Sequence, residues 1–486
     1  MYKKIIIVML IVLGAFTTFF LYRTYAYDTS VVEETPTTTD KAYTFKIGNS
    51  SIKQIKLETG ETKYFDIVLS NPNNAKISYS IYYEMVSPTT KPDGFSIGYT
   101  SKSTGTSTGK VDKNGNITLS IEASNTSSSA VTVKIGTVAG YVNGGELTLG
   151  SGQVIIPKGP VNAVTLINSL DDGTTGDSGS GVYKVTHSAI PSGSSATGSE
   201  IPAVTDYRYY GASPNNYICL DMEGGSTCPD KHLYRIIGSI YEEKENTNRI
   251  KVIKATPLTD GTTKEFSWDY KVNNGSGSYD NIWATITSGN YSNSLTSGSQ
   301  LMKLLNSGAW WNGTSGSYYN DRTTATNVNF TNYKLSDKAK SYISTSRYYL
   351  GGYNSPSILT SAMYGYERGT IRYDTSRPLY WDGMIGLMYP SDYGYAAGNA
   401  CTMGKTLKDY SGNCRKDWLK NSNSEWLMSP YSGDSRIAFH VYPIGYVDGD
   451  FGVRYAYLVR PVFYLTSDVS ISGGTGTSSD PYIATK

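Results

Sequence analysis

Apolar and polar positions alternate along much of the first third of the chain. The run KYFDIVLS places Phe65, Ile67 and Leu69 on one face, and ISYSIYYEM, NITLSIEAS and AVTVKIGTV alternate in the same way. A period of two is typical of β-strands that bury one face. The turn sequences NPNN and KNGN lie between such runs. Residues 42–157 are therefore predicted to form an antiparallel β-sandwich, immunoglobulin-like or jelly-roll.

A second region of different character follows a stretch rich in Gly, Ser and Thr. Residues 158–205 include SLDDGTTGDSGSGV, which predicts a linker and lead-in. Residues 206–486 contain all seven Trp and all four Cys. There LYRIIGSIY and RIKVIKAT predict paired strands, while SGSQLMKLLNSG places Leu301, Leu304 and Leu305 on one helical face. This region is predicted to be α+β, so that the whole chain is a multidomain protein.

The N-terminus has the pattern of an export signal. Lys3 and Lys4 precede an apolar run over Ile5–Leu21, which is between a signal-peptide core and a full membrane span in length. Residues 1–27 are predicted to be either a cleaved signal peptide or a membrane anchor. Residues 28–41 are polar and predict a stalk. Everything beyond them is expected outside the cytoplasm, on the cell surface or secreted, with a membrane contact through the first segment if it is not cleaved.

Composition narrows the classes of partner. The formal net charge is +2, and Lys and Arg are interspersed with Asp and Glu, so nothing indicates a nucleic-acid partner. Charged residues make up only 17% of the chain, whereas Tyr (43) and Gly (50) are abundant. Such surfaces are polar without being charged, and Tyr supplies contact area at low cost in conformational entropy. The same composition is also typical of any β-rich chain.

The four cysteines are predicted to be disulfide-bonded. They fall as two local couples in a chain that is expected to be exported, where an oxidising environment favours disulfides. Zinc is not indicated, because neither couple has zinc-finger spacing and the three His are scattered. No metal or cofactor is predicted. The cysteine residues are Cys219, Cys228, Cys401 and Cys414.

An ordered set of phrases in the second region resembles a known family. YRYYGASPNNYICLD, LYRIIGSI, RIKVIKATPL, YGYERGT, GLMYPSDYGYA, EWLMSPYS and LVRPVFYLTSDVSISGGTGTSSDPY occur in this order. They look like a widespread domain in exported proteins of Gram-positive bacteria. That domain resembles the C-type-lectin-like fold, in the branch shared with formylglycine-generating enzymes and retroelement-diversified proteins. The resemblance implies a C-type-lectin-like domain over residues 206–486.

The resemblance also implies a ligand surface near the C-terminus. In the diversified relatives the corresponding strand and loops hold the contact residues, and here the stretch reads FHVYPIGYVDGDFGVRYAYL. Tyr and Arg are the residue types that dominate binding hot spots. The implied function is non-enzymatic recognition or adhesion, with an extracellular glycan or protein as the ligand. The expected contact residues are Tyr442, Tyr446, Asp450, Arg454, Tyr455 and Tyr457, of which strand alternation would turn about half inward.

Two other classes of function are also compatible with the sequence. One is a structural subunit of a surface layer or fibre. The other is a carbohydrate-active enzyme, which needs two carboxyl groups about 5–10 Å apart across a cleft. Its candidates, each among aromatic residues, are Glu367, Asp382, Asp392 and Glu425. Cys401 and Cys414 do not occur in the phrase that formylglycine-generating chemistry would need.

Calcium-dependent sugar binding is a further alternative. Asp448 and Asp450 in YVDGDFG have a spacing that suits calcium. Asp-Gly is also a common hairpin-turn signal, and a turn is the favoured interpretation.

The segment IGLMYPSDYGYAAGNAC, residues 385–401, shows little helix or strand periodicity. The C-type-lectin-like fold that this region resembles has a long irregular loop, so the resemblance implies such a loop here, in which Leu387, Met388, Tyr389 and Tyr393 pack as a buried seam. Asp392 is expected to bind backbone N–H groups nearby.

Overall fold

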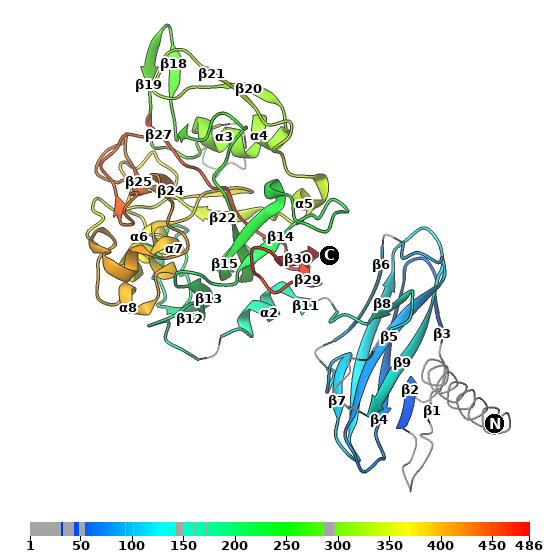
Figure 1. The fold of residues 1–486 in the computed structure, drawn as a ribbon. Coiled ribbons are helices and arrows are strands. Elements are labelled where there is room, and N and C mark those ends of the chain that lie inside the picture. Colours follow the sequence, from blue (N-terminus) through cyan, green and yellow to red (C-terminus); the bar gives the residue numbers. More distant parts are fainter. Residues whose placement is uncertain are drawn as a thin grey trace, which may run out of the picture. The chain divides into compact units, whose positions relative to one another are not determined.

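The chain divides into two compact units, Met1–Val161 and Asn162–Lys486, each of which has its own core (Figure 1). The computed structural model describes residues 31–32, 43–47, 54–92, 94–100, 102–141, 147, 149–159, 161–171, 173–285, 295 and 297–486. The expected export segment, residues 1–27, lies outside the described residues, as does most of the stalk. Within the described part of the chain, no helix combines the length and apolarity that crossing a bilayer requires.

The first unit consists of two antiparallel sheets. One has the strand order β1-β2-β4-β8-β6, and the other has the order β10-β5-β9-β3 with β7 paired to β5. The strands of the first sheet are β1 (Val31–Val32), β2 (Tyr43–Ile47), β4 (Glu61–Ser70), β6 (Phe95–Tyr99) and β8 (Asn116–Asn125). Those of the second are β3 (Gln54–Leu57), β5 (Ile77–Ser87), β7 (Thr108–Val111), β9 (Val131–Tyr141) and β10 (Gln153–Ile155).

A shared core joins these two sheets into a sandwich. Ile67 on β4 is paired in register with Leu119 on β8, and both side chains are fully buried. They belong to the same apolar cluster as Ile81 and Val133, which come from β5 and β9 of the other sheet. The alternation seen in the sequence therefore corresponds to the inward face of each strand.

The second unit is built around a nine-stranded sheet. Its main path is β11-β29-β30-β14-β15-β13-β12, with β16 beside β15 and β28 beside β16. The C-terminal strand β30 pairs parallel to β14. The strands β15 and β16 are paired, as predicted, and they run antiparallel. The strands are β11 (Val161–Asn162), β12 (Gly181–His187), β13 (Val204–Tyr210), β14 (Tyr217–Cys219), β15 (Leu233–Glu242), β16 (Thr247–Lys254), β28 (Val462–Tyr464), β29 (Ser470–Ile471) and β30 (Tyr482–Thr485).

Short helices and small sheets surround this central sheet. Figure 1 shows α6, α7 and α8 gathered beside β24 and β25, while α3 and α4 lie in another part of the unit. The α-helices are α2 (Ala163–Asn168), α3 (Gln300–Asn306), α4 (Ala309–Asn312), α5 (Asp337–Ser341), α6 (Thr360–Glu367), α7 (Pro390–Ala396) and α8 (Asn399–Thr402). The 3-10 turns are η1 (Ser192–Ser194), η2 (Asp230–His232), η3 (Leu407–Asp409) and η4 (Gly412–Arg415).

The remaining strands form one three-stranded sheet, β24-β25-β26, and the two-stranded sheets β17-β27, β18-β19, β20-β21 and β22-β23. They are β17 (Phe266–Ser267), β18 (Lys271–Asn273), β19 (Ser276–Ser278), β20 (Ser315–Tyr318), β21 (Thr326–Asn329), β22 (Ser346–Tyr349), β23 (Tyr380–Gly383), β24 (Glu425–Pro430), β25 (Ala438–Val441), β26 (Val447–Asp448) and β27 (Ala456–Tyr457).

Two expectations about local structure need correction, and one about cysteine is confirmed. Residues 158–205 are more than a linker, because they supply α2 and β12 to the second unit. Residues 385–401 are not an irregular loop, since they contain α7 and α8. The expected seam residues there are nevertheless buried. Both disulfides, Cys219–Cys228 and Cys401–Cys414, form within their local couples.

A fully buried ion network ties α7 to the central sheet. The Asp392 carboxylate accepts hydrogen bonds from Arg208 Nη1 (2.9 Å) on β13 and from Lys251 Nζ (2.5 Å) on β16. It also accepts the backbone N–H of Tyr389 at 3.0 Å, which is the local capping role expected of it. Burial alone would raise the pKa of Asp392, but the charges of Lys251 and Arg208 outweigh burial and hold it at about 2. Arg208 continues the network to Asp206 at 2.7 Å.

The substitution Asp392→Asn is expected to destabilise the second unit by about 3–5 kcal/mol, because it leaves Lys251 and Arg208 buried without their shared counter-charge. Urea unfolding followed by tryptophan fluorescence measures this unit alone, since all seven Trp lie in it. The matched control is Asp434→Asn, which breaks an exposed Asp–Arg pair with Arg436. It should cost less than about 1 kcal/mol. Equal effects of the two changes would contradict a dominant role for the buried network.

Candidate ligand-binding face

A tight hairpin between β25 and β26 places two tyrosines side by side. Tyr442 N–H donates to the carbonyl of Tyr446 (2.8 Å), and Gly445 N–H donates to the carbonyl of Tyr442 (2.8 Å). Gly445 has φ +94°, a backbone conformation that side-chain-bearing residues rarely adopt. The Tyr442 and Tyr446 rings are stacked, with centroids 5.2 Å apart and planes 6° from parallel. Both side chains are half-buried, so that one side of the pair faces solvent.

Three more aromatic side chains extend this surface from the segment after the hairpin. Phe451 is 36% exposed, and its ring lies 5.8 Å from Tyr455 and 6.3 Å from Tyr457. Tyr457 is on β27, which is held by pairing with β17. The two tyrosines are half-buried. We call the set Tyr442, Tyr446, Phe451, Tyr455 and Tyr457 the aromatic face.

A buried histidine lies beneath the aromatic face. His440 on β25 is fully buried, and its ring is 5.2 Å from Tyr457, 5.7 Å from Phe451 and 6.1 Å from Tyr442. Neither ring nitrogen has a hydrogen-bond partner among the described residues. Burial lowers the pKa of His440 to about 4, so the ring is neutral at physiological pH. The neutral ring therefore supports the surrounding rings as an aromatic contact and carries no charge there.

Charged groups surround the aromatic face in opposite-sign pairs. Lys408 pairs with the buried Asp448, and its Nζ lies 4.9 Å from the centre of the Tyr446 ring. Arg454 lies over the Tyr455 ring at 5.0 Å and forms a pair with Asp321 at 3.5 Å. Asp450 is exposed, and partial burial together with Asp448 raises its pKa. The face is therefore neither strongly acidic nor strongly basic.

The structure brings the sequence-predicted contact residues together around one centre. Tyr442, Tyr446, Tyr455 and Tyr457 all contribute to the aromatic face, with Asp450 and Arg454 at its margin; each of the six is at least partly exposed. Sequence reasoning missed His440 and Phe451, although both lie in the same stretch and alternate with the tyrosines. It also missed Lys408, which lies in the 3-10 turn η3, far from this stretch in the chain, so that no sequence pattern connects it to the tyrosines.

The calcium alternative finds no support in the positions of the two aspartates. Asp448 is buried and engaged by Lys408, so it is not directed outward beside Asp450. A different group with possible metal ligands consists of Asp221, Glu223 and His232, whose ligand atoms lie within 4.8 Å of one another. Lys231 is only 2.7 Å from Glu223. Asp221 already accepts the Ser336 hydroxyl at 2.6 Å. These carboxylates thus have partners of their own.

The carboxylates that were considered for glycoside hydrolysis are held by neighbouring groups. Glu367 is fully buried against Ser391, whose backbone N–H and hydroxyl lie 2.9 and 2.5 Å from it. Glu425 is buried and forms a bidentate ion pair with Arg460. Asp382 forms a bidentate ion pair with Arg347. Asp392 lies in the buried network described above. The four cavities found among the described residues are lined by other side chains, and none of these four carboxylates contributes to them.

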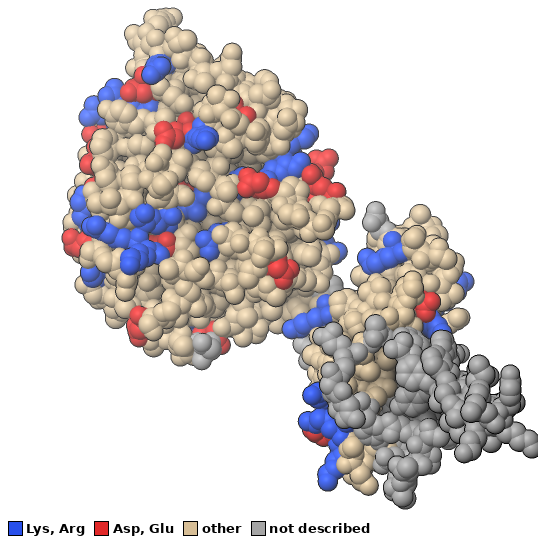
Figure 2. Space-filling view, viewed as in Figure 1, with Lys and Arg blue, Asp and Glu red and all other residues tan. Residues whose placement is uncertain are grey.

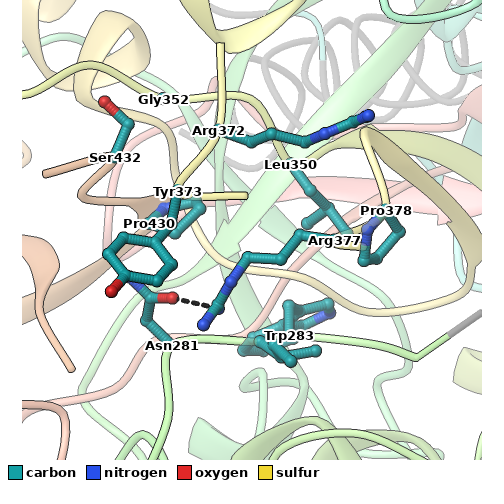
Figure 3. Close-up of a pocket in the computed structure, with 11 residues that line it drawn as sticks. Asn281, Trp283, Leu350, Gly352, Arg372, Tyr373, Arg377, Pro378, Pro430 and Ser432 are labelled. Atoms are coloured by element: carbon teal, nitrogen blue, oxygen red, sulfur yellow. Dashed lines mark hydrogen bonds between the residues drawn. The ribbon is translucent and has the colours of Figure 1, made fainter. Parts of the chain in front are cut away.

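One enclosed cavity is too small for a ligand. Figure 3 shows Arg377 lying over Trp283, with a hydrogen bond between Arg377 and Asn281. Arg372 and Tyr373 complete one side of this pocket. The space between these side chains is only about 20 Å³, which suits a single water molecule.

Comparisons with known proteins were made for the whole chain. A scan against protein-family models gives no match, and searches of curated proteins and of solved structures give none either.

Glu367 should make the stability of the second unit depend on pH. Burial raises its pKa to about 7, against the opposing influence of Arg368 and Ser391. An unfolded glutamate titrates near 4.5. The stabilising contribution is therefore complete below pH 4.5 and is lost as the pH rises through about 7.

The free energy of unfolding should fall by about 3 kcal/mol from this source between pH 4.5 and pH 8. Glu367→Gln removes the titration, so urea unfolding at pH 5 and pH 8 should differ less than in the unchanged protein. Glu200→Gln, at an exposed site, controls for the loss of one formal charge. An unchanged pH dependence in Glu367→Gln would contradict the assignment.

Proposed function

We propose that this protein is a non-enzymatic recognition module of the bacterial cell surface, and that it binds a glycan through the aromatic face. The observation that carries this proposal is the stacked, half-exposed pair Tyr442–Tyr446 with Phe451, Tyr455 and Tyr457 beside it. Flat aromatic rings suit the apolar faces of sugar rings, while their hydroxyl groups can hydrogen-bond sugar hydroxyls.

The residues beneath the aromatic face hold its rings in place, which favours binding without a large rearrangement. β25, β26 and β27 fix the backbone, and the buried His440 ring fills the space beneath the tyrosines. Rings that are already held in place lose little further conformational entropy when a ligand docks. This preorganisation compensates for the modest energy of each ring contact.

The distribution of charged residues on the surface also favours a neutral glycan as the ligand. Figure 2 shows that most of the visible surface of the second unit is neither acidic nor basic, with Lys and Arg gathered over the part where α6 and α7 lie. An uncharged, hydroxyl-rich surface suits a neutral glycan. The two disulfides fit the oxidising environment in which a secreted or surface protein works.

The resemblance to the C-type-lectin-like fold agrees with this function, although the proposal does not need it. A glycan contact of this kind requires no bound calcium, because the aromatic face supplies ring contacts and hydroxyl groups. Binding is therefore expected to be the same in calcium and in a chelator.

The test is a screen of the full-length chain, with disulfides intact, against a broad glycan and cell-wall panel, with and without calcium. The double variant Tyr442→Ala/Tyr446→Ala should raise the Kd of any bound glycan at least tenfold, since loss of hot-spot aromatic residues costs about 2 kcal/mol or more. Tyr373→Ala is the matched control, because Tyr373 is 47% exposed outside the aromatic face.

Binding that survives the double variant would contradict the proposed site. A panel without any bound glycan, combined with capture of a purified surface protein that needs Tyr442, would replace the glycan by a protein ligand. Concentration-dependent polymerisation without either kind of binding would support a structural subunit.

A further inference from the structure

A separate open groove lies on the other side of β27 from Tyr457. Ala456 and Leu458 line it, whereas Tyr457 between them belongs to the aromatic face. Successive side chains of a strand point to opposite faces, which explains how one strand serves both surfaces. The groove encloses about 810 Å³, within the ~300–1,000 Å³ that is typical of small-ligand sites.

The walls of the groove are fixed by hydrogen bonds. Leu258 N–H donates to the carbonyl of Val459 (2.7 Å), and Leu458 N–H donates to the carbonyl of Ser424 (2.9 Å). Across the groove, Asn423 Nδ2 donates to Glu265 Oε1 at 3.0 Å. The two walls, residues 256–265 and 421–423, are therefore held in place before any ligand arrives.

The lining combines apolar side chains with polar side chains that are mostly uncharged. Pro257, Leu258, Ala456 and Leu458 provide the apolar surface. Thr262, Thr263 and Ser422 also line the groove, and their hydroxyl groups form no hydrogen bond within the described part of the chain. These hydroxyl groups are free to bind a ligand that offers donors and acceptors of its own.

Charge is nearly balanced within the groove. Only three of its fifteen lining residues are charged: Asp230, Lys264 and Glu265. Asp230 accepts hydrogen bonds from Lys254 and Thr256, and Glu265 accepts one from Asn423. A strongly anionic or cationic ligand would therefore find little compensating charge.

We infer that this groove is a second binding site, which takes a neutral oligosaccharide. The apolar side chains accommodate the carbon-bound faces of the sugar rings, and the threonine, serine and asparagine side chains hydrogen-bond the hydroxyl groups. This inference is based on the volume, the lining residues and the hydrogen bonds of the groove, and it does not depend on ligand binding at the aromatic face.

The experiment uses the full-length chain and linear neutral tetrasaccharides of glucose, mannose and N-acetylglucosamine. Saturation-transfer NMR and calorimetry measure binding, with tetragalacturonate as an acidic comparison. At least one neutral tetrasaccharide should bind, and Ser422→Trp, which fills the groove from an exposed position, should raise its Kd at least tenfold. Ser192→Trp is the matched control on an exposed turn outside the groove. Thr262→Ala/Asn423→Ala tests the same site without added bulk.

The outcomes separate the two sites. Binding that is lost in Ser422→Trp but retained in Tyr442→Ala/Tyr446→Ala supports the groove. Binding that is lost only in the tyrosine variant overturns the groove and leaves the aromatic face as the glycan site. The inference is also overturned if none of the neutral tetrasaccharides binds, or if tetragalacturonate binds as tightly as they do.

Discussion

The Asp392 carboxylate is the point from which the second unit is organised. It anchors the start of α7 to two strands of the central sheet through Arg208 and Lys251. From α7 the connection continues outward, because the Tyr393 hydroxyl donates to the carbonyl of Gly445 at 3.0 Å. Gly445 lies in the hairpin that stacks Tyr442 on Tyr446. A buried charge is thus linked through one helix to the geometry of the proposed binding surface.

Sequence patterns could predict the first unit because only one face of each strand is buried. Ile67 and Leu69 alternate with more exposed residues on β4, and this period of two is visible in the sequence. In α7 every residue from Pro390 to Ala396 is buried. A helix that is enclosed on all sides has no amphipathic period, so the sequence offered only the local cap at Asp392. Its partners Arg208 and Lys251 are too distant in the chain for any spacing rule to connect them.

The candidate site was predictable to the extent that it lies in one continuous stretch. The tyrosines from 442 to 457 are identified by residue type, and the hairpin brings them together. Alternation could not decide which rings face outward, because Gly445 and the segment after β26 change the direction of the chain between the strands. The engagement of Asp448 by Lys408 depends on tertiary folding alone. That ion pair favours a turn-stabilising role for Asp448 over calcium binding.

The strand β27 contributes side chains to both proposed sites. A short strand that is paired with β17 exposes Tyr457 on one side and Ala456 on the other. A large ring creates a surface for stacking, and a small side chain leaves room for a groove. Because both surfaces contain few unpaired charges, neither relies on long-range attraction, and recognition would depend on shape, ring contacts and hydroxyl hydrogen bonds. Contacts of this kind are individually weak, so a glycan that engages both surfaces would bind more tightly through its raised effective concentration at the second one.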